Sequence, residues 1–91
     1  MEATASVDRI EFEGNGLAGT LPTELGHLSE LKYLYAEQGA IGGTIPTEFG
    51  RLAKLLVLDL DYNYLTGKVI PSELYNLWSL AQLDLNDNLL T

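Results

Sequence analysis

The chain has 91 residues, no cysteine, and 13 acidic against 5 basic residues, which gives a net charge of −8. This length allows one small domain, and the lack of cysteine excludes a disulfide framework, a thiolate metal site and a cysteine nucleophile. The charge argues against binding to nucleic acid or to anionic membranes, both of which require basic surfaces, and the 46% hydrophobic content argues against disorder.

A short strand is predicted near the start of the chain and recurs three times. Residues 1–6 are small or polar, carry no signal-peptide pattern, and are expected to form a short lead without a cap. The apolar pattern Val7, Ile10 and Phe12 follows, and it returns at intervals of 24, 24 and 25 residues with the copies that begin at Leu31, Leu55 and Leu80. Its alternation predicts a half-buried strand in each copy.

The same turn-forming residues follow each strand. Asparagine can bond backbone groups of the next coil, glycine permits a tight bend, and proline can open a short helical turn. The second copy has Gly39 in place of the asparagine, and the third copy has one extra residue at 68–70, which predicts a bulge. The recurring positions are Asn15, Asn63 and Asn88, then Gly19, Gly43 and Gly67, then Pro22, Pro46 and Pro71.

Stacked coils would bury their apolar sides against each other, with parallel strands about 4.8 Å apart. The unit L-x-x-L-x-L-x-x-N-x-L-x-G-x-I-P-x-x-L-G-x-L resembles the plant-specific type of leucine-rich repeat, which is also abundant in algal and protist proteins. The resemblance implies an α/β repeat fold: a right-handed leucine-rich-repeat solenoid of about four coils. Parallel β-strands would line its concave side, a second small sheet would form at the Ile-Pro segment, and short 3-10 helices or turns would form its convex side. The coils are expected at residues 7–30, 31–54 and 55–79, with a partial unit at 80–91.

Outward-pointing residues of the strands form columns rich in acids, with three tyrosines among them. Such a face is typical of recognition of a basic or hydroxyl-rich partner, because tyrosine offers a large contact area. Solvated acids without a further role, and tyrosines that shield a loosely packed second coil containing Ala36, remain open alternatives. The candidate partner-binding residues are Arg9, Glu11, Glu13, Tyr33, Tyr35, Glu37, Asp59, Asp61, Tyr62 and Asp84.

Two smaller groups of residues each have two interpretations. Tyr75 and Trp78 replace glycine and small residues of the earlier copies, so they either cover the core near the end of the chain or dock a following repeat or a partner. Asp59, Asp61 and Asp84 form a weak candidate for a divalent-cation site, since hard cations prefer carboxylates. No cofactor is expected.

Other motifs are better explained by the repeat than by chemistry. The segment 14–19 reads G-x-G-x-x-G, but its glycine at position 19 recurs in later copies and no long helix follows it. His27 falls in a convex-side turn with no nucleophile arrangement around it. Thr20 and Thr44 align in neighbouring coils, and such arrays bind ice in some plant-type repeat proteins. We therefore expect no enzyme.

The first hypothesis for function is a non-enzymatic module that binds a protein or peptide partner through its concave face. The alternative is a segment of a longer receptor-like or polygalacturonase-inhibitor-like ectodomain. The cysteine-paired cap that is usual in the family is lacking, which leaves self-association through uncapped ends open. The family resemblance suggests an extracellular or cell-surface location, although residues 1–91 contain no glycosylation acceptor and no apolar run of membrane-spanning length.

Overall fold

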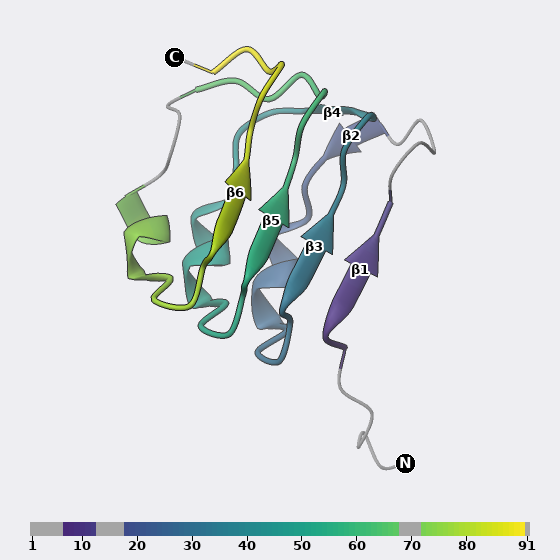
Figure 1. Ribbon diagram of the computed structural model, residues 1–91. Coiled ribbons are helices and arrows are strands. Elements are labelled where there is room, and N and C mark those ends of the chain that lie inside the picture. Colours follow the sequence, from purple (N-terminus) through teal and green to yellow (C-terminus); the bar gives the residue numbers. More distant parts are fainter. Residues whose placement is uncertain (1–6, 13–17, 68–71, 91) are drawn as a thin grey trace.

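The computed structural model describes residues 7–12, 18–67 and 72–90 as a stack of coils, each contributing one strand to a parallel sheet. The strands follow one another in chain order across the sheet (Figure 1). Their register pairs Ile10 with Leu34, Leu34 with Leu58, and Leu58 with Leu83, as the repeat predicts. The solenoid expected from the sequence is therefore confirmed. Its strands are β1 (Arg9–Glu11), β3 (Tyr33–Tyr35), β5 (Val57–Asp59) and β6 (Gln82–Asp84).

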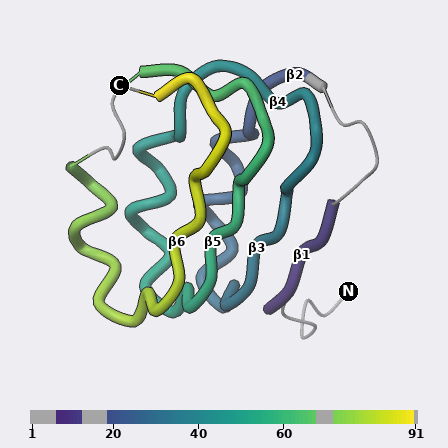
Figure 2. The backbone as a smooth tube through the Cα atoms, turned by 45° about the horizontal axis from the view of Figure 1, so that its top comes forward, coloured from purple at the N-terminus to yellow at the C-terminus, as the bar shows by residue number. Residues whose placement is uncertain are grey.

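In the part of the chain that the structure describes, three 3-10 helices lie on the other side of the coils: two behind the sheet in Figure 1 and the last, in green, to the left of β6, an arrangement that Figure 2 shows from a second direction. They are η1 (Thr23–His27), η2 (Thr47–Arg51) and η3 (Ser72–Asn76). Pro22 and Pro46 directly precede the first two helices with φ of −69° and −63°, close to the value that the pyrrolidine ring imposes. Among the described residues, no helix has the length and apolar character needed to cross a membrane.

A second, two-stranded parallel sheet joins the first coils, formed by β2 (Ala18–Thr20) and β4 (Ala40–Gly42). It lies before the Ile-Pro segment, so the expected position was wrong. Gly43 takes a φ of 75° and turns the chain directly after β4, and Pro46 has no amide proton with which to extend the ladder. The bulge expected at residues 68–70 lies outside the described residues.

The core lies between the four-stranded sheet and the 3-10 helices. Ala36 is as fully buried as the leucines around it, so its small side chain does not open the second coil to solvent. Phe49 and Leu52 close the core from the side of η2. The buried apolar residues are Leu21, Leu31, Leu34, Ala36, Ile41, Ile45, Phe49, Leu52, Leu55, Leu58, Leu60, Leu65, Leu74 and Leu77.

Asn63 ties its coil to the preceding one. Its Nδ2 donates to the carbonyl oxygens of Ala36 at 2.8 Å and Leu60 at 3.0 Å, and its Oδ1 accepts from the Ile41 amide at 3.2 Å. Asn88 repeats this arrangement one coil later, where its Oδ1 accepts from the Leu65 amide at 3.0 Å. Both asparagines thus link neighbouring coils, but they bond the coil before their own, whereas bonds to the next coil were expected from the sequence. Asn15 lies outside the described residues.

Glycine allows the 3-10 helices to approach each other closely. A Cβ built on Gly26 would lie 2.6 Å from the carbonyl oxygen of Glu48, and one on Gly50 would lie 2.7 Å from that of Glu73. Both distances are shorter than real Cβ contacts allow, so each glycine is required by the backbone of the next coil. Tyr75 occupies the same repeat position in η3.

Candidate functional site

The outward side of the four-stranded sheet, here called the sheet face, presents two columns of side chains in register. Arg9 is paired with Tyr33, and Glu11 with Tyr35. Both columns continue across β5 and β6, at the spacing of about 4.8 Å that separates neighbouring strands. The sheet face consists of Arg9, Glu11, Tyr33, Tyr35, Val57, Asp59, Gln82 and Asp84.

The first two strands hold a guanidinium between aromatic rings and a carboxylate. The guanidinium carbon of Arg9 lies 5.5 Å from the ring centroid of Tyr33 and 5.0 Å from that of Tyr35, within the range of a cation–π contact. Its Nε donates to Oε2 of Glu11, and its Nη2 forms an ion pair with the same oxygen. The hydrogen bond to Glu11 raises the pKa of Arg9 above its ordinary value. Arg9 therefore remains a cation throughout the accessible pH range.

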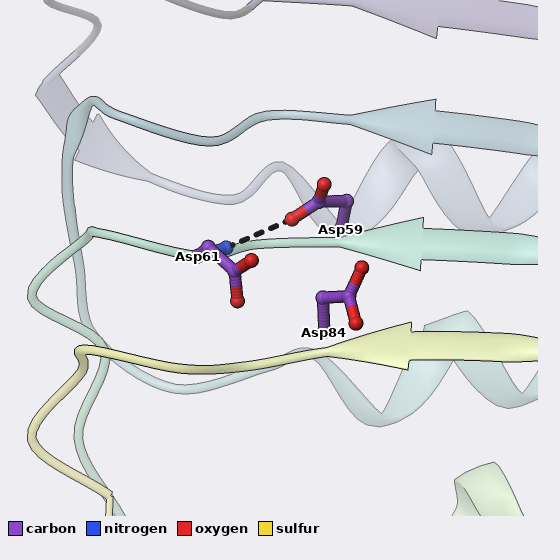
Figure 3. Close-up of side chains that lie close together, drawn as sticks. All are labelled: Asp59, Asp61 and Asp84. Carbon is purple, nitrogen blue, oxygen red and sulfur yellow. Dashed lines mark hydrogen bonds between the residues drawn. The ribbon is translucent and has the colours of Figure 1, made fainter.

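The last two strands hold a cluster of three carboxylates, drawn in Figure 3. One oxygen from each of Asp59, Asp61 and Asp84 lies within 4.8 Å of the others. Asp59 is buried and accepts a bond from the Asp61 amide at 3.2 Å, while Asp61 accepts one from the Asn86 amide at 2.6 Å. Two of the three carboxylates therefore also hold the chain where it leaves the strands.

Burial and neighbouring charge both act on Asp61. Partial burial raises the pKa of Asp61 above its ordinary value, the bond from the Asn86 amide opposes this shift, and the negative charges of Asp59 and Asp84 add to it. A positive group placed among the three carboxylates would relieve this repulsion. Oxygen ligands at this spacing suit a hard cation as well as a basic side chain, so the weak cation candidate stays a prediction.

A row of left-handed residues borders the sheet face where the chain turns away from the strands. Gln38, Tyr62 and Asp87 all have φ of 58–59°, one in each of three successive coils. This conformation costs a non-glycine residue about 1–2 kcal/mol. Tyr62 nevertheless occupies it with 54% of its surface exposed, and it directly follows Asp61 of the acidic cluster along the chain.

The remaining predicted residues lie apart from this centre. Glu37 is half-buried and directly precedes Gln38 of the left-handed row, here called the rim (Gln38, Tyr62 and Asp87). Glu13 lies outside the described residues. Tyr75 and Trp78 are 74% and 91% exposed on and just after η3, so the interpretation that they cover the core is wrong. His27 is exposed at the end of η1.

The structure also exposes two apolar side chains that the sequence did not single out. Tyr64 and Leu89 are 59% and 60% exposed, in irregular segments of successive coils. They follow the ladder asparagines directly, Tyr64 after Asn63 and Leu89 after Asn88. The signal in the sequence was that Tyr64 in the third copy and Leu89 in the fourth are large, whereas Ala40 at the same position of the second copy is small.

Within the chain, residues 54–77 match the family described as Leucine Rich Repeat. No curated protein matches the chain significantly in sequence. Solved structures, by contrast, match nearly its whole length.

The structure of PEPR1–AtPEP1 is 34% identical with a TM-score of 0.91, and the match covers 98% of this chain and 12% of that one. The plant peptide hormone receptor RGFR1 in complex with RGF2 is 32% identical with a TM-score of 0.84, covering 90% and 13%. A plant ice-binding protein is 39% identical with a TM-score of 0.77, covering 81% and 24%. The chain thus spans about one eighth of the length of the two receptor structures.

Proposed function

The chain is a leucine-rich-repeat protein similar to plant receptor ectodomains, and on that premise we propose that it is a non-enzymatic module that binds a basic or polar protein or peptide through the sheet face. The observation that carries this proposal is the column in which Tyr35 stands in register between Glu11 and Asp59, with Asp84 on the next strand. Tyr33, Tyr35 and the rim residue Tyr62 would supply contact area.

The charge of the sheet face supports a cationic partner. Glu11, Asp59 and Asp84 stand in one column, and Arg9 is the sole cation among the eight residues that define the face. Complementary charge accelerates association and excludes acidic partners, and it makes binding sensitive to salt. An extended peptide suits the face, because the two columns of side chains run in lines across the strands. Such a peptide would contact these side chains, since the backbone groups of neighbouring strands already bond each other within the sheet.

The similar receptors support a peptide as the ligand class. PEPR1 is solved with AtPEP1, and RGFR1 is described as a peptide hormone receptor in complex with RGF2. We extend to this chain only the coarse property that a leucine-rich-repeat array presents a sheet for a polypeptide partner.

The test uses two synthetic peptides of equal length, one alternating serine with arginine and one alternating serine with glutamate. Isothermal titration should show binding of the basic peptide alone, weaker at 300 mM than at 50 mM salt. Tyr35→Ala and Asp59→Asn should each weaken it by about tenfold, a typical loss for a central contact residue. Glu48→Gln on η2 removes the same charge from the opposite side and should change binding by less than twofold. Equal losses in all three variants would refute the proposal.

The short coverage of the receptor structures supports an alternative, in which the chain is a segment of a longer repeat array. The sheet face would then be one part of a longer binding surface. Sedimentation across a range of concentrations distinguishes the two, because a segment with open ends self-associates as concentration rises, whereas a self-sufficient module stays monomeric.

The threonines of the first coils, together with the similarity to a plant ice-binding protein, favour ice as a second candidate ligand. Thr20 and Thr44 are exposed beside a shallow depression of about 500 Å³. Their Cγ2 atoms lie 3.1 Å from the positions of a Cβ on Gly43 and on Gly67, so each methyl packs towards the glycine of the next coil. Inhibition of ice recrystallisation that Thr44→Lys abolishes would support this candidate, and no inhibition at millimolar protein would exclude it.

A further inference from the structure

The contact of Arg9 with Tyr33, Tyr35 and Glu11 shows what kind of group the first two strands accommodate. The two rings come from β3 and the carboxylate from β1, and the guanidinium lies against all three. A planar guanidinium can stack on aromatic rings and bond a carboxylate at the same time, which an ammonium group cannot do as well. The arrangement therefore has the elements of an arginine-binding site, with an arginine of the same chain in it.

The fold does not depend on this contact. The side chains of Arg9 and Glu11 are 52% and 37% exposed, and pairs as exposed as this contribute little to stability. Ile10, between them, supplies the apolar contact of β1 with the core. Arg9 lies on β1, an edge strand among the described strands of the sheet, with a long unbranched side chain that can swing into solvent without moving the backbone.

We propose that Tyr33, Tyr35 and Glu11 form a site for an arginine side chain of the partner, and that Arg9 is an internal competitor that the partner's arginine displaces. This inference rests on the proposed function and specifies its partner as an arginine-containing peptide. The exchange replaces one arginine–carboxylate pair with another, so the groups of the site stay paired after binding. The column that starts at Glu11 continues through Asp59 to Asp84, which gives further cationic residues of the same peptide a place to bind.

An internal competitor lowers the apparent affinity by the fraction of time that the site is free. If Arg9 occupies the site for roughly 70–90% of the time, its removal tightens binding about three- to tenfold. The gain should be specific for arginine, because a lysine cannot reproduce the stacked and forked geometry. A general change in charge would instead favour arginine and lysine peptides equally.

The experiment compares Arg9→Gln with Arg51→Gln, which makes the same change on η2 on the other side of the molecule. The probes are two peptides of equal length, alternating serine with arginine or serine with lysine, titrated calorimetrically at one salt concentration. Arg9→Gln should bind the arginine peptide three- to tenfold more tightly and the lysine peptide less than twofold more tightly. Arg51→Gln should change neither by more than twofold. Adding Tyr35→Leu to Arg9→Gln should abolish the gain, and far-UV circular dichroism should show all variants folded.

Three results would overturn the inference: equal gains for both peptides, the same gain in Arg51→Gln, or weaker binding by Arg9→Gln. In each of these cases the proposed function stands as long as Asp59→Asn still weakens the binding of the basic peptide. If neither the unaltered protein nor any variant binds either peptide at millimolar concentration, the proposed function is refuted. The inference that Arg9 competes with an arginine of the partner is then refuted as well.

Discussion

Replacing Asn63 with alanine should be among the most damaging single changes in the chain. The asparagine is buried, and its amide group joins two coils by bonds to the carbonyl of Ala36 and the amide of Ile41. In Asn63→Ala both of these backbone groups lose that partner, and the alanine methyl group can replace neither bond. We therefore expect a large loss of stability without loss of the overall coil arrangement.

The magnitude follows from which partners are left without a bond. The Leu60 carbonyl retains the bond from Asn88, and the Asp61 carbonyl retains the one from the Gln38 amide. Two groups, the Ala36 carbonyl and the Ile41 amide, lose theirs. A buried polar group left unsatisfied costs about 1–3 kcal/mol, so with two such groups the free energy of unfolding should fall by about 2–6 kcal/mol. Since small domains are stable by only about 5–15 kcal/mol, this is a large part of the total.

Asn88→Ala is the matched control, because Asn88 makes the corresponding bonds in a half-buried position. Water can replace part of what is lost there, so a cost of about 1–2 kcal/mol is expected. Urea unfolding monitored by far-UV circular dichroism gives both values. The reasoning is refuted if Asn63→Ala costs less than Asn88→Ala, or less than about 1 kcal/mol.

Gly50→Ala should lower the free energy of unfolding by about 1–3 kcal/mol, because its Cβ would lie 2.7 Å from the Glu73 carbonyl oxygen. Gly42→Ala, whose added Cβ would have its nearest neighbour, an oxygen, 4.0 Å away, should be close to neutral in the same urea unfolding measurements, and equal losses would contradict the close-approach argument. Asp61→Asn should stabilise the fold at pH 7 and flatten the pH dependence of the urea midpoint. Because the pKa of Asp61 is raised in the folded state, the protonated carboxyl stabilises the fold fully below its ordinary pKa of 3.8, and this stabilisation is lost as the pH rises through the folded pKa. An unchanged pH dependence in Asp61→Asn would contradict this reasoning. Tyr62→Asn should stabilise by about 0.5–1 kcal/mol, since asparagine tolerates the left-handed conformation, yet weaken basic-peptide binding at least threefold in titrations; unchanged binding would remove Tyr62 from the site.

The strands and their register could be predicted because one physical requirement repeats along the chain. Each strand turns its central apolar residue, such as Leu34 or Leu58, towards the core and turns the two residues beside it to the opposite face of the sheet. Once the repeat fixes which residue is buried, the pairing of Tyr35 with Asp59 follows, since a shift of one residue would turn every side chain to the other face. The in-register columns of the sheet face were therefore accessible from the sequence.

The side-chain arrangement within the site was not accessible in the same way. The strand position of Arg9 does not by itself fix its rotamer, and its place over Tyr33 and Tyr35 depends on rings that lie 24 residues away or more along the chain. The position of the second sheet was missed because it depends on where Gly43 turns the backbone. The exposure of Trp78 was left open for a related reason: the repeat gives its position on the coil but not the direction of its ring.

The tyrosine at the glycine position of η3 limits how a repeat array can be extended. At Gly26 and Gly50, the backbone of the next coil lies where a Cβ would be, which sets the narrow spacing of the 3-10 helices. Tyr75 already has a Cβ and a ring at this position. A coil stacked on η3 must therefore stand farther away on the helix side than the earlier coils do, while the edge of β6 can still pair at the usual strand spacing. Wider spacing on the helix side alone would increase the curvature of an array at this coil, so a single residue would bend the superhelix there.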